Sequence, residues 1–267
     1  MKNKLFNSKK PIIGMIHLDY LPGQEKFLNF EYVKQKALLD LKNLEAGGVD
    51  GVIIENWKDN TFGPFVNEET RNTLLSISKL IKTKTALPVG INVLPNDYSS
   101  AFYIASKAHL DFIQSDVLSD YVRTNYSYSD ANPFEIKVDI SDFQKARKEN
   151  KCEKKLVFAS VHPKHYTMLD SLTLEESAKR AIKAGADVLV VTGDVTGQQP
   201  DFNNVKTTKS VSKNIPVFIG SGLNKNNAEQ FLKVADGAIV GTAFKTKNFE
   251  KIVKGKVKSL IVEARKA

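Results

Sequence analysis

Eight short apolar runs divide this chain, and the segments between them are long enough for helices. The runs contain few polar residues, as expected of parallel strands buried on both faces. Four of them follow an aspartate, Asp50, Asp111, Asp187 and Asp236, and three others open with proline, which is tolerated at the first residue of a strand. This alternation predicts an α/β fold, a (β/α)8 TIM barrel with two alternating kinds of strand. The expected strands are 11–16, 50–54, 88–93, 111–115, 155–161, 187–192, 216–220 and 236–240.

Helical periodicity and capping residues support the same architecture. Residues 30–46 and 68–82 repeat apolar positions at helical spacing. A helix over 97–108 has an N-cap in Asn96 or Asp97, and a helix over 173–184 begins at a capping box. The last helix is expected at about 248–265. About 24 residues, 116–139, separate the fourth strand from a helix at 140–150, which is long for a connection in a compact domain. This insertion could be a lid, an oligomer contact or a small hairpin.

Length and composition favour one domain over residues 1–267. No apolar run approaches the length of a membrane span, and the N-terminus lacks the apolar core of a signal peptide. The single cysteine, Cys152, suits a reducing cytoplasm, where we expect the protein to reside. The net charge is +9, but the lysines are scattered and are not interleaved with aromatic residues. We therefore expect no nucleic-acid or membrane partner, and the charge favours an anionic substrate.

The last two expected strands both end in glycine, in the segments Pro216–Gly222 and Ala235–Thr242. Loops after the seventh and eighth strands of such barrels often bind phosphate, because glycine lets backbone N–H groups approach an anion. The residues expected to bind phosphate or substrate here are Gly220, Ser221, Gly222, Gly241 and Thr242.

Other polar residues lie where the expected strands end, which is where barrel enzymes carry their catalytic groups. Glu55 directly follows an apolar strand, where a carboxylate is costly to bury without a partner or a task. His17 shares a face with Ile13 and Met15, although a lone histidine there can equally be a core residue. Asp97 can equally be a helix cap, and Thr192–Gly197 a tight turn. The catalytic candidates are Glu55, Lys164, His17, His165 and Asp97; the further binding candidates are Asn56, Asn92, Thr192, Gly193 and Thr196.

Cofactor signals are weak. No dinucleotide fingerprint, phosphate-binding P-loop or nucleophile elbow is present, so we expect no dinucleotide cofactor. His17, Glu55, Asp97 and His165 are possible ligands for a divalent metal, but they lack a recognisable ligand spacing. No metal residue is assigned.

These motifs together resemble the BtpA/SgcQ family of β/α barrels over most of the chain. The matching segments include 14–23, 50–56, 90–97, 164–165, 191–197, 220–222 and 236–242 with Lys245. The resemblance implies a barrel of the ribulose-phosphate-binding type. It implies two kinds of function: an enzyme of sugar metabolism, and a factor for photosystem I biogenesis.

Three positions depart from what the resemblance implies. Pro95 and Gln114 stand where the family usually has arginine, and Ser160 stands where it usually has aspartate. Each lost arginine removes a clamp for an anion. We expect an enzyme, a lyase or isomerase that abstracts a proton next to a carbonyl in a small phosphorylated sugar. Lys164 could polarise that carbonyl or form an imine. The alternative is a non-catalytic binding or assembly factor that keeps the barrel and its anion site. In either case a homo-oligomer is expected.

Overall fold

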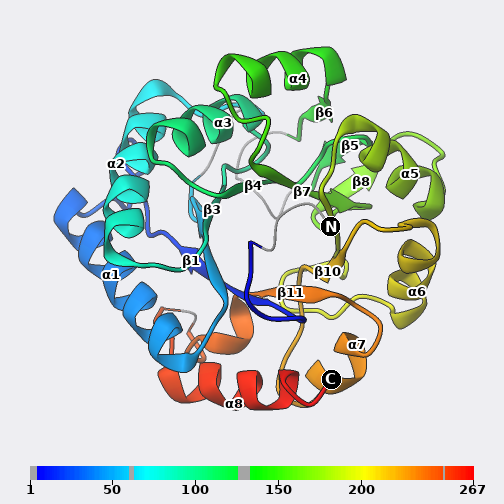
Figure 1. Cartoon of the computed structure of the whole chain (residues 1–267). Coiled ribbons are helices and arrows are strands. Elements are labelled where there is room, and N and C mark those ends of the chain that lie inside the picture. Colours follow the sequence, from blue (N-terminus) through cyan, green and yellow to red (C-terminus); the bar gives the residue numbers. More distant parts are fainter. Residues whose placement is uncertain (1–4, 60–62, 126–132, 249) are drawn as a thin grey trace.

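The computed structural model describes residues 5–59, 63–125, 133–248 and 250–267. Within these residues, eight parallel strands form a closed barrel in the order β1-β11-β10-β9-β7-β4-β3-β2. Figure 1 looks into this ring of strands, with the helices outside it. This confirms the (β/α)8 barrel predicted from the apolar runs. The barrel strands are β1 (Ile12–His17), β2 (Gly51–Glu55), β3 (Val89–Asn92), β4 (Phe112–Ser115), β7 (Leu156–Val161), β9 (Val188–Val191), β10 (Val217–Ile219) and β11 (Gly237–Val240).

The helices lie close to their expected positions where the sequence indicated them. The capping box of Thr173 and Glu176 is present, and Asp97 is the N-cap of its helix. The last helix begins later than expected, because Lys245 and Ile252 form an antiparallel bridge before it. The helices are α1 (Phe30–Gly47), α2 (Glu68–Lys84), α3 (Tyr98–Lys107), α4 (Ile140–Glu149), α5 (Leu174–Ala184), α6 (Phe202–Val211), α7 (Ala228–Leu232) and α8 (Lys254–Ala264).

The connection over 116–139 contains two short strands, β5 (Tyr121–Thr124) and β6 (Glu135–Lys137). They pair antiparallel, and β5 also pairs antiparallel with β8 (Tyr166–Met168), which follows β7. The sheet therefore joins the segments that leave the C-terminal ends of β4 and β7. Its buried face packs Val122 and Ile136 against Tyr166. Residues 126–132, between β5 and β6, lie outside the described residues.

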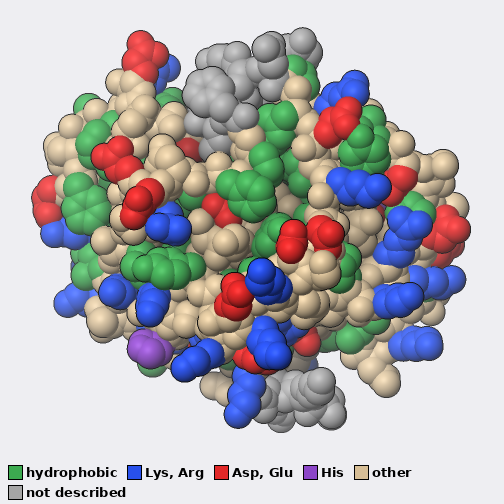
Figure 2. Space-filling view, turned by 90° about the horizontal axis from the view of Figure 1, so that it is seen from above, with side chains coloured by type: hydrophobic (Ala, Val, Ile, Leu, Met, Phe, Trp, Pro, Cys, Tyr) green, Lys and Arg blue, Asp and Glu red, His purple; other side chains and the backbone are tan. Residues whose placement is uncertain are grey.

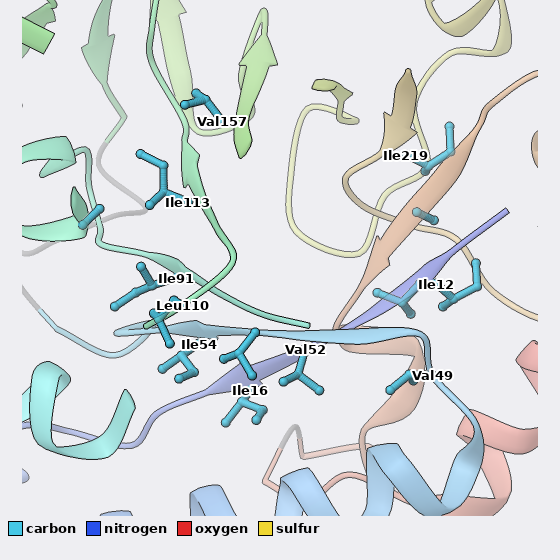
Figure 3. Close-up of a cluster of buried hydrophobic side chains, with 14 of the residues drawn as sticks. Ile12, Ile16, Val49, Val52, Ile54, Ile91, Leu110, Ile113, Val157 and Ile219 are labelled. Carbon is cyan, nitrogen blue, oxygen red and sulfur yellow. The ribbon is translucent and has the colours of Figure 1, made fainter. Parts of the chain in front are cut away.

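Each barrel strand places alternate side chains in two different cores. Ile13 and Met15 point into the barrel, where they join Phe112, Phe158 and Phe218. Their neighbours along the strands face the helices and form the larger core, part of which is drawn in Figure 3 with Ile12, Ile16, Val52 and Ile54 among the labelled residues. This alternation explains why the strands read as continuous apolar runs.

The N-terminal segment packs against the end of the barrel at which the strands begin, called the lower end below. The Phe6 ring lies edge-on to Phe112, with 6.1 Å between ring centroids, and Phe112 stacks on Phe158 at 4.7 Å. A Cβ at Gly51 would lie 2.8 Å from the Phe6 ring, so glycine there makes room for it. In Figure 1 this segment crosses the middle of the ring of strands. The opposite end, where the strands terminate, carries the candidate site.

Candidate active site

A row of polar side chains crosses the C-terminal ends of four neighbouring strands. The strand registers pair His17 of β1 with Glu55 of β2, Glu55 with Asn92 of β3, and Asn92 with Gln114 of β4. Side chains in register on adjacent strands lie side by side. The folding of the sheet therefore brings together residues that are far apart in the sequence. It also confirms that His17 shares the inner face with Ile13 and Met15.

Asn92 bridges two buried carboxylates in this row. Its Nδ2 donates to Glu55 Oε2 at 2.9 Å and lies 3.4 Å from Asp116 Oδ1. Gln114 Nε2 donates to the same Asp116 oxygen at 2.9 Å. Glu55 is 8% exposed and Asp116 is 7% exposed. Two buried acidic groups thus share one amide.

Burial makes both carboxyl groups harder to ionise. It raises the pKa of Glu55 to about 7, with a further contribution from the negative charge of Asp116. Burial also raises the pKa of Asp116, and the positive charge of Lys164 acts against this. Glu55 therefore exchanges its proton near neutral pH, as a general base or acid must.

His17 lies against Glu55 as a neutral imidazole. Its Nε2 is 3.4 Å from Glu55 Oε1, and its ring packs on Trp57 with centroids 5.1 Å apart. Burial lowers the pKa of His17 well below its usual value, and the charges of Lys245 and Lys164 lower it further. A neutral imidazole can donate a hydrogen bond to a substrate oxygen or pass a proton on.

Lys164 and His165 enter from the loop between β7 and β8. The Lys164 backbone N–H donates to Thr192 Oγ1 at 3.0 Å, which ties this loop to the end of β9. His165 Nε2 lies 2.7 Å from Thr196 Oγ1. Burial and the charge of Lys164 lower the pKa of His165 to about 4, so His165 is neutral at pH 7. The fold brings the loop between β7 and β8 and the loop after β9 to the same cavity.

The loops after β10 and β11 form the other side of the cavity. Ser221 Oγ accepts from the Gly193 N–H at 2.9 Å and donates to the Gln198 carbonyl oxygen at 2.9 Å. Gly222 has φ +69°, and a Cβ there would lie 2.0 Å from the Gln199 nitrogen. Thr242 and Ala243 open a short 3-10 turn, so their N–H groups have no acceptor within that turn. Such N–H groups can bind an anion.

A cavity of about 360 Å³ connects these groups. That volume suits a small ligand. Of the catalytic candidates it includes Glu55, His17, Lys164 and His165, and it also contains Asp116 and Gln114. The binding candidates that line it are Thr192, Thr196, Gly220, Ser221, Gly222, Gly241 and Thr242.

The remaining candidates lie outside the lining of the cavity. Asp97 accepts N–H bonds from Ser100 at 2.8 Å and Val66 at 3.0 Å, so both oxygens serve the local fold. Asn56 accepts from the Leu94 N–H at 2.7 Å and supports the loop after β3. The Gly193 N–H donates a hydrogen bond to Ser221 Oγ. Asn92 does not line the cavity itself but holds the Glu55 and Asp116 carboxyl groups that do.

Sequence reasoning missed three residues as members of the site. Asp116 directly follows β4 and Glu55 is the last residue of β2, so both lie at the C-terminal end of a strand. Trp57 follows Glu55 and contacts His17. Lys245 is 2% exposed, its Nζ lies 4.6 Å from the centroid of the Trp57 ring, and burial lowers its pKa to about 8. Asp116 could have been found by the strand-end rule, whereas the contact of Lys245 with Trp57 depends on the turn after β11.

Among the residues described by the structure, no group of three or more His, Cys, Asp or Glu side chains has a geometry that could hold a metal ion. Within the same residues, no helix is both long and apolar enough to cross a membrane. On the face shown in Figure 2, Lys and Arg side chains are interspersed with Asp and Glu.

The fold and the candidate site together define a β/α barrel in which two buried carboxyl groups, Glu55 and Asp116, line the same cavity as the glycine-rich loops after β10 and β11. The chain belongs to the BtpA family, whose model matches residues 8–266. It is 36% identical to an uncharacterised protein of Methanocaldococcus jannaschii, over 89% of this chain and 87% of that protein. It is 32% identical to the photosystem I biogenesis protein BtpA of Synechocystis, over 90% of this chain and 82% of that protein.

A solved structure with a similar fold is (S)-3-O-geranylgeranylglyceryl phosphate synthase from Thermoplasma acidophilum, in complex with its substrate sn-glycerol-1-phosphate. The TM-score is 0.58, with 17% sequence identity, and the match covers 97% of this chain and 94% of that one. At this identity the likeness concerns the fold alone.

Proposed function

We propose that this protein is an enzyme that binds a small phosphorylated sugar and abstracts a proton next to its carbonyl group. The observation that carries the proposal is Glu55, a buried carboxyl with a pKa of about 7 at the end of a barrel strand. Active sites characteristically shift carboxyl groups towards neutral pH in this way. Isomerisation and aldol cleavage both use this chemistry, so the enzyme is a lyase or an isomerase.

The phosphate binds at the loops after β10 and β11. Ser221, Gly222, Gly241 and Thr242 supply backbone N–H groups, and Thr242 adds a hydroxyl. The absence of a side chain at Gly222 lets the backbone of Gln198 and Gln199 pack against this loop. The solved synthase of similar fold has sn-glycerol-1-phosphate as its substrate, which supports a phosphorylated ligand for this barrel. Binding the remote phosphate would hold the reacting carbons over Glu55.

The polar groups of the site divide the work of proton abstraction between them. Ionised Glu55 takes the proton from the carbon next to the carbonyl, and Asn92 keeps its carboxylate in place. Lys164 polarises the carbonyl oxygen or forms an imine with the carbonyl carbon. Neutral His17, with His165 at the rim, donates a hydrogen bond to the oxygen on which charge develops.

Deuterium exchange tests this chemistry directly. Sugar phosphates of three to six carbons are incubated with the protein in D2O, and NMR follows loss of the proton next to the carbonyl. We expect exchange with the wild-type protein and a loss of about a hundredfold or more in Glu55→Gln. Borohydride trapping, with Lys164→Met as the control, identifies an imine. Phosphosugar binding without any exchange would overturn the proposed chemistry.

A second candidate function is a non-catalytic binding or assembly factor. It is favoured by the name of the Synechocystis relative, a photosystem I biogenesis protein. This function predicts ligand binding without deuterium exchange, together with a stable protein partner. The same NMR experiment therefore distinguishes the two candidates.

Self-association and a cytoplasmic location belong to the same proposal. Leu28, just before α1, and Phe30 and Tyr32, in its first turn, are 67%, 38% and 42% exposed. These side chains offer an apolar surface for a second copy of the chain. Sedimentation of the protein, with Leu28→Ser as a variant, tests whether this surface mediates an oligomer.

A further inference from the structure

One end of the cavity, formed at the C-terminal ends of β2 and β4 and called the inner end below, is lined with hydrogen-bond acceptors. Glu55, Gln114 and Asp116 all line it. Gln114 Oε1 is buried and has no hydrogen-bond partner among the described residues, and the same holds for Asn92 Oδ1 beside it. A buried acceptor without a partner is costly, and a ligand that donates a hydrogen bond removes that cost.

The orientation of both amides follows from their partners. Gln114 Nε2 faces Asp116 Oδ1, and Asn92 Nδ2 faces Glu55 Oε2. Rotating either amide by half a turn would bring its oxygen against a carboxylate oxygen. The amide oxygens are therefore the atoms left unpaired, and Gln114 is one of the residues that line the cavity.

The charge balance at this end is unfavourable for an anion. Among the described residues that line the cavity, Lys164 is the one lysine or arginine, and it faces both Glu55 and Asp116. A third carboxylate would meet two acidic groups whose nearby positive charges are Lys164, which lines the cavity, and Lys245, which acts on Glu55 from outside its lining. A hydroxyl group would instead provide a donor for Gln114 Oε1, which has none among the described residues.

The acceptor-lined end lies across the barrel from the phosphate loops. In the closed ring, β4 is four strands away from β11 in either direction, and β3 is four strands away from β10. Figure 1 shows these strands on opposite sides of the ring. A ligand whose phosphate sits at the β10 and β11 loops therefore extends its other end towards β3 and β4.

We propose that this inner end binds the hydroxyl-bearing carbon chain of a neutral sugar phosphate, and that Gln114 and Asp116 reject compounds carrying a carboxylate there. This inference rests on the proposed function, because it uses the phosphate site to set the direction of the ligand. It adds the substrate class: sugar monophosphates without an acid group.

Calorimetric titration of the wild-type protein with a matched pair of unreactive compounds tests the inference. Erythritol 4-phosphate and 4-phosphoerythronate differ only in a hydroxymethyl group against a carboxylate, and inorganic phosphate probes the phosphate loops alone. We expect the alcohol to bind at least about tenfold more tightly than the acid. Equal or tighter binding of the acid overturns the inference and leaves the phosphate site standing. Failure of all three compounds to bind overturns the phosphate site and this inference together.

Variants of Gln114 separate charge from hydrogen bonding. Gln114→Arg brings a cation to the inner end, so we expect it to narrow or reverse the preference for the alcohol. Gln114→Met has similar length without the acceptor, so we expect it to weaken alcohol binding without improving acid binding. Unfolding curves establish that each variant is folded. An unchanged ratio of the two affinities in Gln114→Arg would overturn the role given to Gln114.

Discussion

At the scale of single residues, the proton on Glu55 links function to stability. Burial raises its pKa from 4.5 to about 7, so the native protein holds this proton more tightly than the unfolded chain. The unfolded state then ionises first, and stability falls as the pH rises between these two values. The loss is complete above the folded-state pKa and amounts to about 3 kcal/mol.

Glu55→Gln removes this titration while keeping an oxygen that accepts from Asn92. We expect the variant to gain about 3 kcal/mol relative to wild type when the pH rises from about 4 to about 8. Urea unfolding at the two pH values measures the difference, and the titrating groups far from Glu55 cancel in the comparison. A variant whose stability runs parallel to that of wild type would show that Glu55 titrates normally.

Gly222 provides a second prediction at this scale. Its positive φ and the 2.0 Å approach to Gln199 N leave no room for a methyl group. We expect Gly222→Ala to cost about 1–3 kcal/mol in stability and to weaken phosphate binding. Gly255→Ala is the matched control, because a Cβ there meets nothing within 4 Å and lies in a helix. Thermal unfolding with and without inorganic phosphate compares the two. Equal behaviour of the variants would remove the role assigned to the Gly222 backbone.

At the scale of elements, the four aspartates that precede alternate strands perform the same task. Each carboxylate accepts an N–H from the first or second residue of the preceding barrel strand: Asp50 from Ile12, Asp111 from Val89, Asp187 from Val157 and Asp236 from Val217. Each also pairs with a cation in a helix or directly after one: Arg265, Lys82, Arg147 and Lys209 respectively. The sequence repeat thus reflects a structural unit of two strands, repeated around the lower end of the barrel.

Asp50 is the best position at which to test this unit. Its carboxylate accepts from Ile12 N at 2.7 Å and from Arg265 Nη2 at 2.8 Å, and its side chain is 13% exposed. We expect Asp50→Ala to cost about 2 kcal/mol and Asp50→Asn less, since asparagine keeps an acceptor for the strand. Urea unfolding measures both. Glu68→Ala, at an exposed i,i+3 pair, serves as the control and should change stability by less than about 0.5 kcal/mol.

Elements with strong local signals were predictable from sequence, and those defined by long-range pairing were not. The apolar runs predicted the barrel strands, and the capping box predicted α5. β5, β6 and β8 are three or four residues long and gain their identity only by pairing with each other. In the candidate site, the same limit applies: the strand-end rule indicated Glu55, but its pairing with Asp116 through Asn92 depends on the register of three strands.

At the scale of the whole molecule, the barrel divides stability from function between its two ends. The N-terminal segment and the four aspartates act at the lower end, and the candidate active site occupies the upper end. A layer of Phe112, Phe158 and Phe218 lies inside the barrel between them. A change at the lower end should therefore alter the free energy of unfolding without altering ligand binding.

Phe6→Ala tests this division. The substitution removes the ring that packs against Phe112 and Gly51, and we expect it to cost about 2 kcal/mol, less than a fully buried phenylalanine because Phe6 is partly exposed. Val262→Ala, at a position 52% exposed on α8, is the control and should change stability little. The affinity for inorganic phosphate, measured by calorimetry at a temperature where both variants are folded, should stay within about twofold of wild type. A large loss of affinity in Phe6→Ala would mean that the phenylalanine layer transmits strain to the mouth, and that the two ends of this barrel are coupled.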